Sequence, residues 1–220
     1  MNEILGRLTC FLIGAACGSF LTAEAVARKT AGKSSFEIGT GNPGMANIMA
    51  QLGFVPGIIV LAGDLGKTIA ACLISYLLFS KAIGPISLFY AGLGATVGHC
   101  FPAWHRFRGG KGVSCCCMAL FLISPLWGLL ADVLGMLVVF FTQYLCLGGA
   151  AIPMFFIPPA FVIYGPEGGV LAIILAALCF YEHWPAIRTI PSGNCPKNDV
   201  WGKIREGISS LREKRSPENR

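Results

Sequence analysis

Long uncharged stretches divide the chain at intervals that suit membrane-spanning helices. The twenty residues between Lys111 and Asp132 and the thirty-four between Asp132 and Glu167 contain no Asp, Glu, Lys or Arg, and a helix needs ~20 apolar residues to cross the hydrocarbon of a bilayer. The apolar runs are continuous and lack the alternation of barrel strands. Because backbone groups in lipid must be hydrogen-bonded internally, the pattern predicts an all-α polytopic membrane bundle.

About seven transmembrane helices are expected. They cover roughly residues 5–27, 54–80, 84–103, 112–124, 125–143, 147–164 and 167–185. Ser124 and Pro125 predict a tight turn between the fourth and fifth spans, and one long helix over 112–143 is the alternative. Residues 1–187 form a single bundle in this interpretation, and residues 188–220 form a basic cytoplasmic tail. Either an amphipathic helix on the membrane surface or disorder suits the tail, in which helical spacing relates Trp201, Ile204, Ile208 and Leu211.

Composition and charge support this topology. Hydrophobic residues make up 55% of the 220 residues and charged residues 13%, against roughly 25% charged residues in soluble domains. With the amino terminus outside and the carboxyl terminus cytoplasmic, fourteen of the seventeen Lys and Arg residues lie on the cytoplasmic side, as expected of multi-pass membrane proteins. The net charge of +6 therefore indicates contact with anionic membrane lipids and gives no support for nucleic-acid binding.

Cysteine and histidine spacing gives no sign of a metal site. None of the ten cysteines forms a Cys-x-x-Cys pair, and most lie within predicted spans, so we interpret them as small packing residues. The three histidines have no spacing typical of metal ligands, so no metal is expected. A Ser-His-Asp hydrolase is excluded for want of a Gly-x-Ser-x-Gly sequence.

The first candidate site is the glycine-rich stretch EIGTGNPGMANI, residues 37–48. Glycine lets backbone N–H groups approach a ligand closely, and a turned loop of this composition is able to hold an anion. The alternative is an ordinary connection between two membrane helices.

The second candidate is GHCFPAWHRFRGGKGVS, residues 98–114, which joins two histidines and three cations to a Gly-Gly-Lys-Gly run. Arg and Lys beside backbone amides bind phosphate well, although these cations alternatively serve only to fix topology. The spacing is not that of a Walker loop. Asp64 and Lys67 are three residues apart in the second span, so they form either a structural ion pair or a polar group facing the cytoplasmic site.

Taken together, the two loops resemble those of the bacterial acyl-phosphate:glycerol-3-phosphate acyltransferases. IGTGNPGMAN is similar to that family's IGSGNPGATN, and the second stretch is similar to GHxFPxxxxFxGGKGVA. GDLGK at 63–67 matches an Asp-x-x-Lys of the second span, and Tyr181 with His183 matches the start of a third motif. Order and spacing agree from about residue 14 to 188.

The resemblance implies a seven-helix enzyme of the bacterial cytoplasmic membrane. Its partners would be acyl phosphate, glycerol 3-phosphate and membrane lipids, its product lysophosphatidic acid, and no cofactor, metal or coenzyme A would be required. Catalytic roles would fall to Thr40, Asn42, Lys111 and His183. Substrate binding would involve Gly39, Gly41, Gly44, Asn47, Asp64, Lys67, His99, Arg106, Arg108, Gly109, Gly110 and Gly112.

Several polar residues of the family pattern are replaced. Hydroxyl-bearing, arginine or asparagine positions are occupied by Ala46, Ala50, Cys146, Gly149 and Ala186. Pro185 is expected to disturb the helix around the third motif. A catalytically silent paralogue that binds phospholipid or acyl phosphate is therefore an alternative function, and a small anion transporter, suggested by the intramembrane Asp64 and Lys67, is another.

Overall fold

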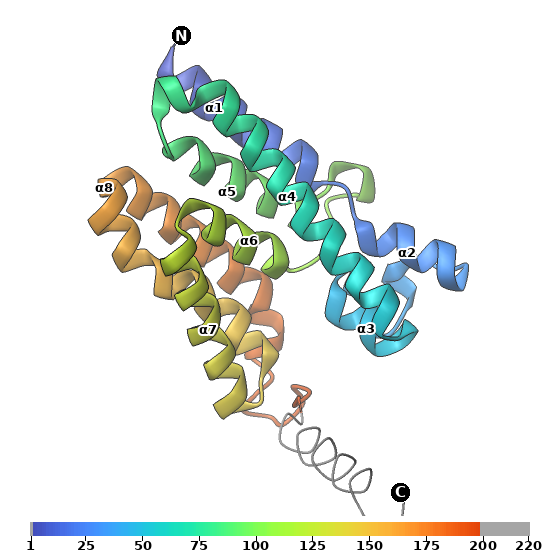
Figure 1. Ribbon diagram of the computed structural model, residues 1–220. Coiled ribbons are helices and arrows are strands. Elements are labelled where there is room, and N and C mark those ends of the chain that lie inside the picture. Colours follow the sequence, from blue (N-terminus) through green and yellow to red (C-terminus); the bar gives the residue numbers. More distant parts are fainter. Residues whose placement is uncertain (1, 199–220) are drawn as a thin grey trace, which may run out of the picture.

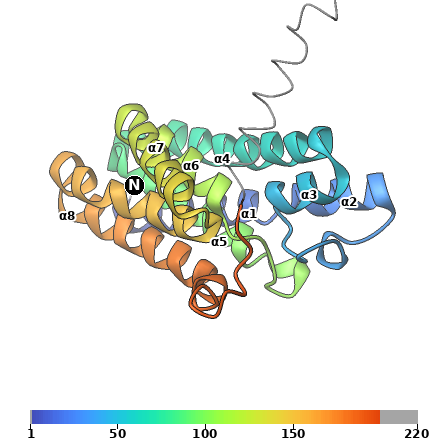
Figure 2. The ribbon, with the colours of Figure 1, turned by 90° about the horizontal axis from the view of Figure 1, so that it is seen from below.

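The computed structural model describes residues 2–198, and within that range all regular structure is helical. The elements are α1 (Glu3–Gly18), α2 (Thr22–Ala31), η1 (Ser35–Glu37), α3 (Met45–Leu52), α4 (Phe54–Ile83), α5 (Ile86–Cys100), η2 (Ala103–His105), α6 (Val113–Ile123), α7 (Pro125–Thr142) and α8 (Leu145–Ile187). Helices α1, α4 and α5 pack together, α6, α7 and α8 form a second group, and α2 and α3 project to one side (Figures 1 and 2).

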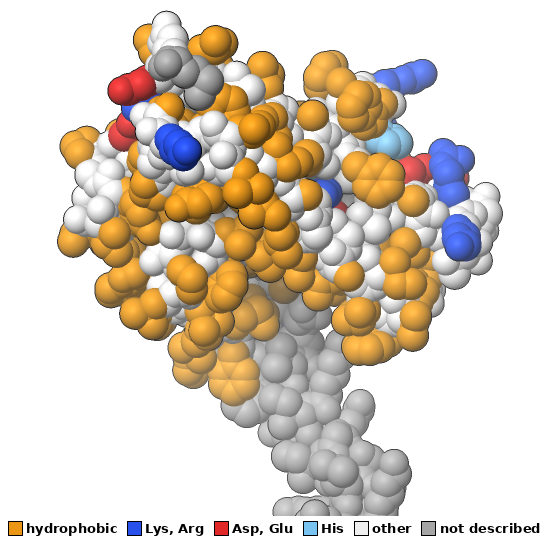
Figure 3. Space-filling view, turned by 45° about the horizontal axis from the view of Figure 1, so that its top comes forward, with side chains coloured by type: hydrophobic (Ala, Val, Ile, Leu, Met, Phe, Trp, Pro, Cys, Tyr) orange, Lys and Arg blue, Asp and Glu red, His pale blue; other side chains and the backbone are white. Residues whose placement is uncertain are grey.

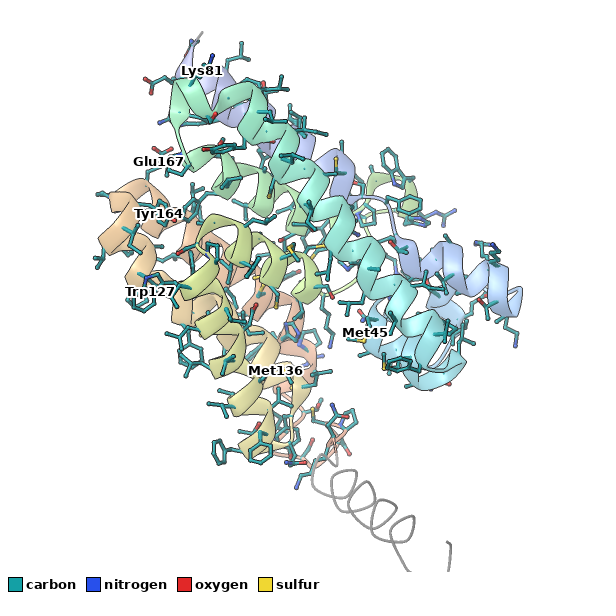
Figure 4. The ribbon with its side chains drawn as sticks, in the orientation of Figure 1. Met45, Lys81, Trp127, Met136, Tyr164 and Glu167 are labelled. Atoms are coloured by element: carbon teal, nitrogen blue, oxygen red, sulfur yellow. The ribbon has the colours of Figure 1, made fainter. Side chains whose placement is uncertain are left out.

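The predicted all-α polytopic architecture is confirmed. In the described part of the chain, four helical stretches are long and apolar enough to cross a membrane, namely residues 3–31, α4, α7 and α8. Gly165 (φ 72°, ψ −168°) divides α8 into two arms, with Tyr164 and Glu167 on either side of the bend (Figure 4). With α1, α4, α5, α6 and α7, these arms correspond to the seven predicted segments.

The boundaries differ from the prediction at two places. The expected span over 5–27 lies within the apolar stretch of residues 3–31, but its helix is interrupted, because α1 ends at Gly18 and α2 begins at Thr22. In this break the Phe20 carbonyl accepts a hydrogen bond from Lys67, at 2.8 Å, instead of continuing a helix. The expected span over 84–103 ends at Cys100, since Phe101 precedes Pro102 and the α conformation is disfavoured before proline.

Two prolines singled out in the sequence have different effects: a break in the helix precedes Pro125, whereas α8 continues past Pro185. Ser124 is extended (φ −149°, ψ 99°) and separates α6 from α7, so the predicted turn is confirmed and a single helix over 112–143 is excluded. The expected disturbance at Pro185 is wrong. Helix α8 continues to Ile187, and the Arg188 amide donates to the Trp184 carbonyl at 3.0 Å, because Pro185 falls where the helix is already ending.

Glycines allow α1 and α5 to pack with their backbones in contact. A Cβ on Gly14 or Gly18 would collide with backbone of α5, and a Cβ on Gly94 or Gly98 would collide with backbone of α1. Close packing through small residues four apart is a characteristic association of membrane helices. It places the break after Gly18 beside the end of α5, where the second glycine-rich loop begins.

The surface of the bundle is mostly apolar. Hydrophobic side chains cover much of the face in Figure 3, and charged side chains gather at its ends. Trp127 and Met136 of α7 are 40% and 58% exposed and lie on the outside of the bundle (Figure 4). The predicted amphipathic helix of the tail falls outside the described residues.

Candidate functional site

The first glycine-rich loop is held by Asn47, on the first turns of α3. The Asn47 amide nitrogen donates to the carbonyls of Ile38 (2.9 Å) and Asn42 (3.0 Å), and its oxygen accepts from the Thr40 amide at 3.0 Å. Asn47 is 6% exposed, so its side chain is committed to the loop. Asn47, one of the predicted substrate-binding residues, thus holds the loop in place.

In this loop, polar side chains are available to bind a ligand, whereas several backbone amides are already hydrogen-bonded. The amides of Thr40, Gly41 and Gly44 are all hydrogen-bonded inside the segment, to Asn47, to the Ile38 carbonyl and to the Asn42 carbonyl. Gly39 and Gly41 have φ values of 55° and 70°, a region that favours glycine. The accessible polar groups are therefore the exposed Thr40 hydroxyl and the half-buried Asn42 amide.

Glu24 on α2 anchors the segment that leads into this loop, and it was missed in the sequence. Its carboxylate accepts from the Ser35 amide (2.8 Å), the Ser35 hydroxyl (2.6 Å), the Ser34 hydroxyl (3.0 Å) and Arg28 (2.6 Å). Glu24 is 6% exposed. The available signal was an acid inside a predicted membrane span, which is costly without partners.

The second glycine-rich loop closes against the end of α5 and against the first loop. The Gly110 amide donates to the His99 carbonyl at 3.1 Å. A Cβ on Gly110 would collide with the His99 ring and would lie 3.0 Å from the Pro43 carbonyl, so only glycine fits between the two. Trp104 donates from its indole nitrogen to the Ser19 carbonyl at 2.9 Å. The two stretches singled out in the sequence therefore meet at Pro43 and Gly110.

Beneath this junction lies a buried charged cluster. The Lys67 ammonium of α4 is 2.8 Å from Asp64 Oδ1 and 2.7 Å from His99 Nδ1. The Lys67 and Asp64 side chains are 6% and 2% exposed, and His99 is 4% exposed. The pair thus faces inward, toward the loops. It is also an ion pair.

Lys67 fixes the tautomer of His99. An ammonium group carries only donors, so His99 Nδ1 must accept, and the ring proton lies on Nε2. Nε2 is the atom that faces Gly110. His99 thus presents an N–H donor toward the junction of the two loops.

His183, on the second arm of α8, has the opposite arrangement. Its Nδ1 is 2.7 Å from the Cys179 carbonyl, which only accepts, so Nδ1 carries the proton and Nε2 is left as an acceptor. A Cβ on Gly149, on the first arm, would be 2.6 Å from His183 Nε2 and 3.1 Å from a methyl carbon of Val113. The ring therefore fills the space that any side chain at position 149 would need.

Lys111 lies between the junction of the two loops and His183. Half-buried between Gly110 and Gly112, it lies close enough to Glu182, His183 and Cys146 to interact electrostatically with them. Gly112 (φ 74°) begins α6 and packs against Thr96 and Cys100 of α5. Lys111 therefore lies between Gly110, at the junction of the two loops, and Val113, which lies beside Gly149 and His183.

Two predicted cations lie outside this arrangement. Arg106 and Arg108 are exposed, and the Arg108 guanidinium is 5.9 Å from the centre of the Phe36 ring. Ala50, where the family pattern has Arg, is an exposed residue of α3, as is Ala46.

These features define a class: a polytopic helical membrane protein with glycine loops, a lysine and two differently protonated histidines at one end of the bundle. Comparison with known proteins narrows the class. A family model described as glycerol-3-phosphate acyltransferase matches residues 8–193. The chain belongs to this family, and the predicted membership is confirmed.

Relatives and solved structures agree with this assignment. Glycerol-3-phosphate acyltransferase 1 of Lactobacillus acidophilus is 32% identical over 212 residues, which cover 94% of this chain and 100% of the relative. Glycerol-3-phosphate acyltransferase 2 of Moorella thermoacetica is 33% identical over 193 residues, covering 86% and 94%. Among solved structures, the glycerol 3-phosphate form of PlsY (YgiH), an integral membrane glycerol 3-phosphate acyltransferase, is 25% identical with a TM-score of 0.77 and coverage of 92% and 98%. Its lysophosphatidic acid form gives a TM-score of 0.76 with coverage of 87% and 94%.

Proposed function

We propose that the protein transfers a fatty acyl group from an acyl phosphate to the 1-hydroxyl of glycerol 3-phosphate, releasing lysophosphatidic acid and inorganic phosphate. The observation that carries the proposal is the meeting of the two loops at Pro43 and Gly110, with Lys111 next in the chain and near His183. Family membership and the two PlsY forms, with glycerol 3-phosphate and with lysophosphatidic acid, support this choice of acceptor and product.

The chemistry needs a proton acceptor and a stabilised leaving group. The glycerol hydroxyl oxygen attacks the acyl carbonyl carbon, and the bond from that carbon to the phosphate oxygen breaks. His183 Nε2, left unprotonated by the bond from Nδ1 to Cys179, accepts the hydroxyl proton. Lys111 and the His99 N–H stabilise the charge that develops on the departing phosphate. The Thr40 and Asn42 side chains orient the acceptor.

We also propose that the site faces the cytoplasm and that the amino terminus lies outside. The start of α1, the α4–α5 turn and the bend of α8 lie toward the upper left of Figure 1, away from α2, α3 and residues 188–198. Lys81 lies at that far end of the bundle (Figure 4). In intact cells, a membrane-impermeant maleimide should label a Lys81→Cys variant and spare Lys33→Cys; the reverse labelling would contradict the topology.

The decisive experiment is an assay of the purified protein in detergent with palmitoyl phosphate and glycerol 3-phosphate. Release of phosphate and formation of lysophosphatidic acid are expected in equal amounts. Lys111→Ala should lower turnover by at least about 100-fold, the usual loss when one group that stabilises transition-state charge is removed. Lys81→Ala is the matched control, because it removes an exposed lysine at the opposite end.

Two results would contradict the proposal. Absence of turnover with a panel of phosphorylated alcohols, in a protein that still binds acyl phosphate, would favour the silent paralogue. Full activity in Lys111→Ala would refute the placement of the phosphate group.

A further inference from the structure

Two cysteines far apart in the sequence lie side by side where α8 begins and where the segment after its end returns. The Sγ atoms of Cys146 and Cys195 are 3.7 Å apart, and both residues are 6% exposed. Cys146 is in the first turn of α8, and Cys195 follows the end of that helix. Neither thiol has a part in the acyl transfer described above.

The approach of these thiols is enforced by contacts on both sides. The Asn198 amide donates to the Gln143 carbonyl at 2.8 Å, and the Lys197 ammonium is 5.8 Å from the centre of the Tyr144 ring. These contacts hold the segment after α8, residues 188–198, against the turn between α7 and α8. The separation of the two sulfurs is thus a property of the fold.

We propose that Cys146 and Cys195 are a reversible oxidation site that forms an intramolecular disulfide. The sulfurs must move together by roughly 1.7 Å to reach a bonding distance of about 2.05 Å, a change that side-chain rotation supplies. A second thiol contact, between Cys116 and Cys179, lies inside the apolar core of the bundle. Cys195 instead has exposed neighbours, Asn194 and Pro196, so a water-soluble oxidant reaches it more readily.

The oxidant is a hydroperoxide, with hydrogen peroxide as its simplest member. The thiolate of one cysteine attacks a peroxide oxygen, which yields a sulfenic acid and, after protonation, water. The sulfur of the second cysteine then attacks the sulfenic sulfur, forms the S–S bond and expels a second water. Two thiols are oxidised and one peroxide is reduced to two waters. A dithiol reverses the step by exchange.

The disulfide controls access to His183, a consequence that rests on the proposed function. His183 is 2% exposed, so a substrate reaches Nε2 only when the structure around it opens. Gly149, which contacts the ring, lies three residues and about one turn after Cys146 on the same helix face. A bond from Cys146 to Cys195 ties both arms of α8 and the following segment together beside this contact. Oxidation should therefore slow turnover.

The test uses the full chain in detergent. The protein is treated with hydrogen peroxide, blocked with N-ethylmaleimide and digested, and mass spectrometry looks for a peptide pair that joins residues 146 and 195 and is lighter by two hydrogens. The same sample should show a Tm raised by about 5 °C or more, as expected for closing a loop of this length. Its turnover should be at least about fivefold lower, because the disulfide restrains the opening that His183 requires. Dithiothreitol should restore the turnover.

Variants separate the pair from general oxidation. Cys195→Ser should be as active as the reduced protein and should keep its activity and Tm in peroxide. Cys17→Ser, which removes a half-buried thiol of α1, should respond like the unmodified chain.

Different results would contradict the disulfide site, its control of access to His183, and the proposed function. Free thiols at both positions after treatment, or oxidation to separate sulfinic acids, would overturn the site. A complete crosslink with unchanged turnover, or equal inhibition in Cys195→Ser, would overturn its control of access. A reduced protein without turnover would instead contradict the proposed function, and the linked peptide and the Tm would still decide whether the site exists.

Discussion

The two buried histidines of the site have the same side chain in opposite states. His99 accepts from Lys67 through Nδ1 and presents an N–H at Nε2, whereas His183 donates from Nδ1 to the Cys179 carbonyl and presents an acceptor. Their surroundings differ in kind: a charged cluster on two packed helices sets His99, and the backbone of its own helix sets His183. The partner of Nδ1 therefore decides whether Nε2 of a histidine donates or accepts a hydrogen bond.

The comparison also shows where this chain departs from the family pattern. On the His99 side, the glycine loops are held by hydrogen bonds, and Asp64 and Lys67 are retained as an ion pair. On the His183 side, Cys146, Gly149 and Ala186 stand where polar residues are expected. The histidine ring occupies the space beside Gly149, so the lost hydroxyl leaves no cavity at this position.

The largest effect is expected from removing the proton acceptor. His183→Ala should lower kcat by about 10² to 10⁴-fold, the usual contribution of a positioned base. His105→Ala is the matched control, because His105 is a half-buried histidine of η2 that packs against Phe36. Steady-state kinetics with both substrates measures the loss. A decrease below tenfold would show that His183 is not the acceptor.

Changes at Lys67 and Asp64, which hold His99 in its donor form, should reduce activity less than His183→Ala does and reduce stability more. Lys67→Met leaves Asp64 buried without its partner and should lower the free energy of unfolding by about 3–5 kcal/mol. In Asp64→Asn/Lys67→Met, stability should recover in part while turnover stays reduced by about 10²-fold, because His99 is no longer held in its donor form. Thermal unfolding and activity of both variants check this. Recovery of activity in the double variant would make the cluster purely structural.

Loss of the loop anchor should have a moderate effect. Asn47→Leu keeps the side-chain volume but removes three hydrogen bonds from the first loop, and an unpaired buried polar group costs about 1–3 kcal/mol. We expect the KM for glycerol 3-phosphate to rise by roughly tenfold because the loop is no longer fixed. Ala50→Leu, at an exposed position of α3, is the control. Equal KM values in the two variants would contradict the positioning role.

The smallest effect is expected at an ion pair far from both histidines. Arg7 donates to both carboxylate oxygens of Glu167, at 2.6 and 3.0 Å, and joins α1 to the second arm of α8. The side chains are 24% and 37% exposed, so Arg7→Met should cost about 1 kcal/mol or less and leave kinetic constants within about twofold of the original. A large kinetic effect would show that the α8 bend is coupled to the site.

Much of the fold followed from the sequence, because membrane crossing depends on a local property. Apolar run length and the Ser124–Pro125 turn predicted the helices and their order. The break between α1 and α2 did not follow, since it depends on the Phe20 carbonyl meeting Lys67, 47 residues away. Glu24 was missed for the same reason: its four donors, three of them from Ser34 and Ser35, come together only when α2 packs beside the loop.

By itself the sequence determined the helical membrane class, the two glycine loops and the family, because these depend on composition, run length and short motifs. Only the tertiary structure decided what the residues do to one another. It made Asn47 a loop anchor, set opposite tautomers on His99 and His183, left Arg106 and Arg108 outside, and brought Cys146 beside Cys195. Such roles depend on contacts a few ångströms long between residues far apart in the chain, and a linear pattern carries no record of those distances.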